Sequence, residues 1–157
     1  MRRRDRRVSR AADGTFRLHL PDREREVLRT LPAQLRELLA VGDPALERLF
    51  PPAYLDDPEQ QAEYASLVHD DLLRQRATSL EVMEETIDAD RLDEEQLSAW
   101  LSALNDLRLV LGTRLGITED MYEEGLPEEG PDAPKYAVYA YLGWLEEQVV
   151  AALAEGL

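Results

Sequence analysis

The segment from Leu97 to Leu115 constrains the fold most strongly, because its large apolar residues recur at the spacing of one helix face. The stripe consists of Leu97, Trp100, Leu101, Leu104, Leu107, Leu111 and Leu115. Asp93 precedes it as a suitable helix cap, and Gly116 follows it as a residue that readily ends a helix. The spacing therefore predicts one long helix whose apolar face is buried against other elements.

Four further segments show apolar residues at helical spacing, bounded by prolines, glycines or capping acids. They span residues 22–41, 44–50, 58–87 and 134–154. Pro32 lies inside the first of them, and a proline in a helix is expected to kink or divide it near Leu31. We therefore expect a mainly α-helical fold, a bundle of about five helices that forms a single domain over residues 1–157.

Residues 8–20 predict a small β-hairpin at the N-terminal end of this bundle. Asp13 and Gly14 form a strong turn signal, because glycine accepts a positive φ without steric cost. After the turn, Phe16 and Leu18 alternate with polar residues, which is the period of a half-buried strand. Two strands alone are only marginally stable, so the hairpin is expected to pack on the helices.

Charge is distributed unevenly along the chain, whose formal net charge is −15. Residues 1–36 hold eleven arginines against five acidic residues, whereas residues 37–157 hold twenty-eight acidic residues against six arginines and one lysine. Residues 118–134 contain seven of these acids together with glycines and prolines, and we expect an exposed, mobile loop there. Most of the molecule should therefore repel nucleic acid.

The arginines near the N-terminus are the candidate nucleic-acid-binding residues, since clustered arginines neutralise phosphates. Residues 1–7 are expected to form a flexible basic arm. The cluster consists of Arg2, Arg3, Arg4, Arg6, Arg7, Arg10 and Arg17. The same arginines can instead pair with the acidic surface of the chain itself or with an acidic partner, so DNA binding is one of three alternatives.

The composition offers little catalytic or metal-binding chemistry. The chain has no cysteine, which excludes disulfides, thiolate catalysis and thiol redox sensing. Its two histidines, His19 and His69, are too few for a zinc site, and no serine lies in a nucleophile-elbow motif. We expect no cofactor, no metal and no enzymatic activity. We also expect a cytoplasmic protein, because the sequence shows neither a membrane-spanning apolar run nor a secretion signal.

Two polar residues, Asn105 and Arg108, share the apolar face of the central predicted helix. A buried arginine needs a carboxylate, and we expect Asp56 or Asp57 to supply it from the preceding loop. The four residues would then form a structural polar latch between that loop and the helix. The alternative is that Arg108 faces a cleft, where it would serve a small-anion binder or an enzyme.

The last predicted helix is apolar over most of its circumference, which indicates a central position or an interface. Tyr139, Trp144 and Val150 widen its apolar face and are the candidate interface residues. A protein partner is therefore expected. A homodimer formed through this helix is one form that such a contact can take.

Three segments and one glycine are similar to a known family. They are Gly14 with its following strand, residues 43–64 (DPALERLFPPAYLDDPEQQAEY), residues 99–117 (AWLSALNDLRLVLGTRLGI) and residues 138–153 (VYAYLGWLEEQVVAAL). The chain resembles an actinobacterial family of uncharacterised domains, encoded near the ClpS adaptor gene, which includes AosR-type oxidative-stress transcriptional regulators. The resemblance implies a mostly helical, non-enzymatic regulator that acts through protein–protein contacts and, as an additional route, DNA contacts. An adaptor or interaction module without DNA binding is the main alternative.

Overall fold

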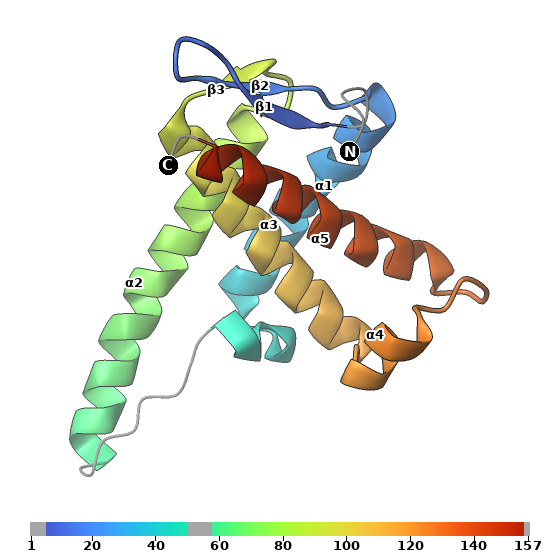
Figure 1. Ribbon diagram of the computed structural model, residues 1–157. Helices are drawn as coiled ribbons and strands as arrows, with labels where there is room; N and C mark the ends of the chain where they lie inside the picture. Colours follow the sequence, from blue (N-terminus) through green and yellow to red (C-terminus); the bar gives the residue numbers. More distant parts are fainter. Residues whose placement is uncertain (1–5, 50–57, 156–157) are drawn as a thin grey trace.

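A computed structural model describes residues 6–49 and 58–155 of the chain, and most of this part is helical (Figure 1). The helices are α1 (Asp22–Val41), the 3-10 helix η2 (Pro44–Leu49), α2 (Pro58–Glu85), α3 (Glu94–Leu115), α4 (Glu119–Glu124) and α5 (Ala133–Ala154). The strands are β1 (Val8–Arg10), β2 (Phe16–Leu18) and β3 (Arg91–Leu92). The predicted mainly α-helical class, with a small β element at the N-terminus, is confirmed.

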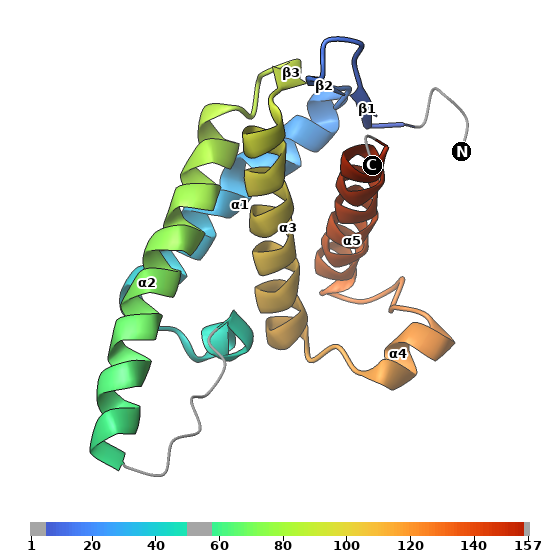
Figure 2. The ribbon, with the colours of Figure 1, turned by 60° about the vertical axis from the view of Figure 1, so that its left-hand side comes forward.

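Helix α3 is the centre of the bundle, and it contacts α1, α2, α5 and η2 (Figure 2). Its Trp100, Ala103 and Leu104 are completely buried. The helix begins with a capping box, in which the Asp93 side chain accepts a hydrogen bond from the Gln96 backbone while the Gln96 side chain accepts one from the Asp93 backbone. The helix ends at Leu115, and the next residue, Gly116, adopts a left-handed conformation. Both predicted ends of this helix are therefore confirmed.

Helix α1 runs through Pro32 as one helix, so the expected division near Leu31 is wrong. Pro32 lies on the buried face together with Leu28 and Leu35. Packing of this face against the core offsets the backbone hydrogen bond that proline cannot donate. The residue before the helix, Pro21, makes no side-chain cap.

The predicted hairpin is confirmed, and it gains a third strand that the sequence reading missed. Strand β1 pairs antiparallel with β2, and β2 pairs antiparallel with β3, so that Phe16 lies opposite Leu92. Val8, Phe16, Leu18 and Leu92 are buried on one face of this sheet. The sheet covers one end of the bundle and contacts α5 through β1.

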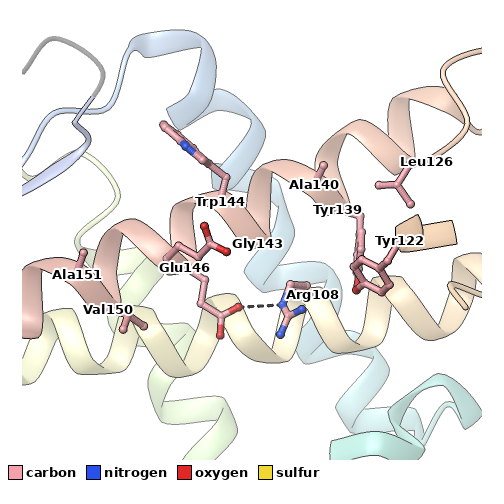
Figure 3. A pocket seen from close by; sticks show the side chains of 11 residues that line it. Arg108, Tyr122, Leu126, Tyr139, Ala140, Gly143, Trp144, Glu146, Val150 and Ala151 are labelled. Atoms are coloured by element: carbon pink, nitrogen blue, oxygen red, sulfur yellow. Dashed lines mark hydrogen bonds and ion pairs between the residues drawn. The ribbon is translucent and has the colours of Figure 1, made fainter. Parts of the chain in front are cut away.

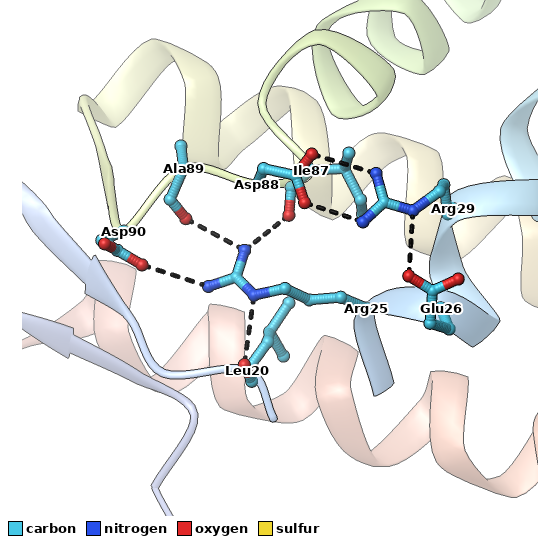
Figure 4. A network of polar contacts seen from close by, with 8 residues as sticks. All are labelled: Leu20, Arg25, Glu26, Arg29, Ile87, Asp88, Ala89 and Asp90. Atoms are coloured by element: carbon cyan, nitrogen blue, oxygen red, sulfur yellow. Dashed lines mark hydrogen bonds and ion pairs between the residues drawn. The ribbon is translucent and has the colours of Figure 1, made fainter. Parts of the chain in front are cut away.

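A buried arginine explains why β3 forms where a helix end and cap were expected. The Arg25 guanidinium lies in the turn between α2 and β3 (Figure 4). It donates hydrogen bonds to the carbonyl oxygens of Leu20, Ile87 and Ala89. Carbonyls beyond a helix C-terminus lack intrahelical donors, and here Arg25 supplies them. The turn is thereby held against α1, which brings Arg91 and Leu92 beside β2.

We expected residues 118–134 to form a loop throughout. This expectation is wrong in part, because α4 occupies residues 119–124. Glu119 and Asp120 fall in its first turn, where acidic side chains interact favourably with the helix dipole. None of its residues is buried. Its Tyr122 side chain reaches α5, where the two tyrosine hydroxyls of Tyr122 and Tyr139 form a hydrogen bond.

An ion pair inside the bundle joins α2 to α3. Asp106 is completely buried, and its Oδ1 accepts a 2.7 Å hydrogen bond from Nη1 of Arg76. A second donor of Arg76, Nη2, lies 3.3 Å from the carbonyl oxygen of Leu49, the last residue of η2. Three elements therefore meet at one charged pair.

Candidate functional site

The candidate site is a groove along one side of α5, which we call the α5 groove (Figure 3). It has a volume of about 710 Å³, and its walls come from α3, from α4 with the following loop, and from α5. The lining residues are Arg108, Tyr122, Leu126, Tyr139, Ala140, Gly143, Trp144, Glu146, Glu147, Val150 and Ala151.

An ion pair between α3 and α5 borders the α5 groove. Nε of Arg108 donates a 2.9 Å hydrogen bond to Oε2 of Glu146, and Nη2 lies 3.5 Å from Oδ1 of Asn105 (Figure 3). Burial opposes the charge on Arg108, but Glu146, Tyr139 and Tyr122 together outweigh this effect, so the pKa of Arg108 is raised. A Cβ at Gly143 would stand 3.5 Å from Cδ of Arg108, which is an ordinary van der Waals contact, so the arginine stem packs against α5 at this position. The arginine therefore remains charged and is already engaged by a carboxylate.

A pair of tyrosines closes one end of the α5 groove. The Tyr139 ring is buried, whereas Tyr122 is 61% exposed, and their ring centroids lie 6.5 Å apart. Burial, followed by the hydrogen bond with Tyr122, raises the pKa of the Tyr139 hydroxyl. Gly112 of α3 makes space for this ring, because a Cβ there would lie 3.0 Å from Cε2 of Tyr139. The absence of a side chain at Gly112 thus permits close packing of α3 and α5.

The other end of the α5 groove is formed by Trp144 and Val150. The guanidinium carbon of Arg7 stands 5.1 Å from the centroid of the Trp144 ring, which holds one face of this ring in place. Val150 is 49% exposed, a large fraction for an apolar side chain on a packed helix. All three candidate interface residues line the same groove, although Tyr139 itself is buried within the chain.

The structure brings Asn105 and Arg108 together, but Asp56 and Asp57 lie outside the described residues. The carboxylate that Arg108 contacts in the described part of the chain is Glu146. The charged group that the sequence reading missed is Asp106. Ala103 and Val110 share a helix face with it, and this second apolar row was the available signal.

The described arginines of the N-terminal cluster have different partners. Arg2, Arg3 and Arg4 lie outside the described residues, Arg6 pairs with Glu155, and Arg7 donates to Glu24 at 3.0 Å. Arg10 stacks on the Phe16 ring, with its guanidinium carbon 4.8 Å from the ring centroid, and Arg17 is exposed. Part of the basic charge is thus neutralised by the chain's own acids.

The family model described as "Domain of unknown function (DUF2017)" matches residues 2–153. The chain belongs to this family. The "Putative oxidative stress regulator AosR" of Mycobacterium leprae is 34% identical over 129 residues, which cover 71% of this chain and 58% of that protein. The "Oxidative stress regulator AosR" of Mycobacterium tuberculosis is 32% identical over 129 residues, covering 71% of this chain and 59% of that protein.

This DUF2017 chain therefore matches less than three fifths of the length of these curated relatives. No solved structure matches it. Within the described residues, no helix is sufficiently long and apolar to cross a membrane.

Proposed function

We propose that this chain is a non-enzymatic regulatory protein linked to the oxidative stress response, and that it acts by binding a helical segment of a partner protein in the α5 groove. The names of the mycobacterial relatives support the regulatory part of this proposal. One observation supports the binding part. The interface candidates Tyr139, Trp144 and Val150 come together in a single groove of about 710 Å³.

The lining of the α5 groove favours a helix as the occupant. Ala140, Gly143 and Ala151 place small side chains along the α5 wall, so a partner backbone can approach closely. Between and beyond them, Tyr122 and Val150 leave apolar surface exposed. Partner helices commonly bind such grooves through apolar side chains spaced three or four residues apart.

The charge around the α5 groove favours a basic flank on that helix. Glu146 and Glu147 lie in its lining, and α4 beside it carries Glu119, Asp120 and Glu123. Complementary charge speeds association and rejects partners of the same sign. We therefore infer a partner segment with one apolar stripe and with lysines or arginines beside it.

The test is a comparison of two matched variants, Val150→Asp in the groove and Val41→Asp at the far end of α1. Both valines are exposed, at 49% and 76%, so both variants should fold. Proteins captured from a lysate by the wild type would be purified, and their binding to each variant measured by titration. We expect at least a tenfold loss of affinity for Val150→Asp, because a desolvated carboxylate faces apolar anchors, and little change for Val41→Asp.

The mapped binding segment must also be helical with a basic flank. Equal affinity for both variants would overturn the proposal. Self-association that Val150→Asp abolishes, measured by light scattering, would instead identify a second copy of the chain as the occupant. A specific small anion that raises the melting temperature of wild type but not of Arg108→Gln would favour the anion-binding alternative.

A further inference from the structure

A second concavity lies at the β-hairpin, and we call it the hairpin pocket. It has a volume of about 660 Å³ and is formed by β1, β2 and the segments beside them. Its polar lining consists of Arg6, Ser9, Arg10, Arg17 and His19, and two alanines complete it. No acidic residue lines it in the described part of a chain with net charge −15.

Arg17 is exposed and free to contact a ligand. Arg6 is already paired with Glu155. Arg10 and Arg17, by contrast, contact no carboxylate among the residues that the structure describes. Nε of Arg10 is moreover buried without a hydrogen-bond acceptor in this part of the chain. Arg10 lies opposite Phe16, on the buried face of the sheet, whereas Arg17 lies on the other face, so an anion can contact Arg17 but not this buried Nε.

The two arginines lie in different surroundings. The guanidinium of Arg10 lies over the Phe16 ring, which limits its movement. Arg17 stands directly opposite Ser9 on β1 and Arg91 on β3 in the sheet register. Like charges on neighbouring strands repel each other, and a bound anion would reduce this repulsion. Arg91 has its own acid, Asp13, at 3.1 Å, whereas Arg17 has none in the described structure.

These groups match a phosphate in chemistry and a nucleotide in size. Planar guanidinium groups donate parallel hydrogen bonds to phosphate oxygens, and the Ser9 hydroxyl beside His19 adds a further donor. A volume of 660 Å³ falls in the range of sites for small molecules. A long DNA duplex would also meet the acidic remainder of the chain, whereas a small anion would not.

We propose that the hairpin pocket binds a small phosphorylated anion of nucleotide size, whose phosphate contacts Arg17 on the sheet face that also carries Ser9. This site is separate from the α5 groove and goes beyond the function proposed above. The partner-binding proposal can therefore fail without affecting this one. The hairpin pocket is also distinct from Arg108, the position at which a small-anion site was considered from the sequence.

The test is isothermal titration of the full chain with ADP and with inorganic pyrophosphate, and with adenosine as the phosphate-free probe. We expect ADP and pyrophosphate to bind and adenosine not to bind. Arg17→Gln should raise the dissociation constant for ADP roughly tenfold, because one charged hydrogen-bond donor is lost. Arg74→Gln is the matched control, since Arg74 is exposed on α2 and pairs with Asp71 at 3.3 Å.

Circular dichroism of both variants should match the wild type, because both side chains are exposed. No binding of ADP or pyrophosphate to the wild type would overturn the proposal. So would an equal loss of affinity in both variants, which would indicate attraction by overall charge. Binding of a short DNA duplex that depends on Arg17, without binding of ADP, would show a nucleic-acid surface instead.

Discussion

The Asp106 carboxylate should make the stability of this protein depend on pH in an unusual direction. Its side chain is completely buried, and Oδ2 has no hydrogen-bond partner in the described structure. Burial raises the pKa of Asp106 to about 6 from the ordinary 3.8; Arg76 opposes this effect and Glu146 on α5 adds to it. Since one pKa unit corresponds to about 1.36 kcal/mol, ionising this group in the folded protein costs about 3 kcal/mol more than in the unfolded chain.

The sign follows from which state holds the proton. Between pH 3.8 and about 6 the folded protein keeps the Asp106 proton, whereas the unfolded chain has released it. Stability therefore falls as pH rises through this window, by at most about 1.4 kcal/mol per pH unit from this one group. Asparagine resembles the protonated form. Asp106→Asn should match the wild type near pH 4 and exceed its stability by up to about 3 kcal/mol above pH 7.

The assay is urea unfolding at a series of pH values, followed by tryptophan fluorescence. Trp100 is completely buried and donates a 2.7 Å hydrogen bond to Thr86, so its emission should report loss of the core. The difference between variant and wild type removes the contributions of all other titrating groups. Asp71→Asn, at an exposed position on α2, is the control and should show no such difference. A loss of stability in Asp106→Asn at pH 7 would refute the reasoning, because the ion pair with Arg76 would then outweigh the cost of burial.

Two further pairs of variants, compared by urea unfolding, test the packing of α3 against α5 and the role of the buried Arg25. Gly112→Ala should destabilise the protein by about 1 to 2 kcal/mol, since its Cβ would press on Tyr139, whereas Gly143→Ala should stabilise it by about 0.5 to 1 kcal/mol through helix propensity. Equal changes in these two variants would show that Tyr139 yields freely. Arg25→Met should cost about 3 kcal/mol, because buried carbonyls lose their donors. Arg29→Met should cost much less, because its ion pairs are exposed. Similar losses in this second pair would contradict the capping role of Arg25.

The sequence predicted the elements whose signal is local. Helix α3 is an example, because its stripe, its capping acid and its terminal glycine all lie within one segment. Strand β3 escaped prediction because it is two residues long and depends on contacts from Arg25, far away in the chain. Helix α4 was not predicted, because the acidic residues and glycines in residues 118–134 are typical of a loop.

Four residues that line the candidate site were named from the sequence, but their arrangement was not. Tyr139, Trp144, Val150 and Arg108 were selected for separate reasons, and only the fold brings them together in one groove. Spacing along α3 places Arg108 on a face, but it carries no information about which carboxylate of α5 meets it. The burial of Asp106 was not predicted, because Asp106 lies on the helix face next to the one that carries Asn105 and Arg108.

The third strand also has a consequence for the order in which the chain folds. β3 is separated from β2 by α1, η2 and α2, so the sheet is completed only after these helices have brought their ends together. The amide of Leu18 donates a 2.9 Å hydrogen bond to the carbonyl of Asp90 across this junction. Its hydrogen exchange should therefore be slow and should require opening of the whole domain, whereas amides in the exposed α4 should exchange through local fraying. The β1–β2 turn can form from local sequence alone, but the complete N-terminal sheet forms only when the helical bundle has formed.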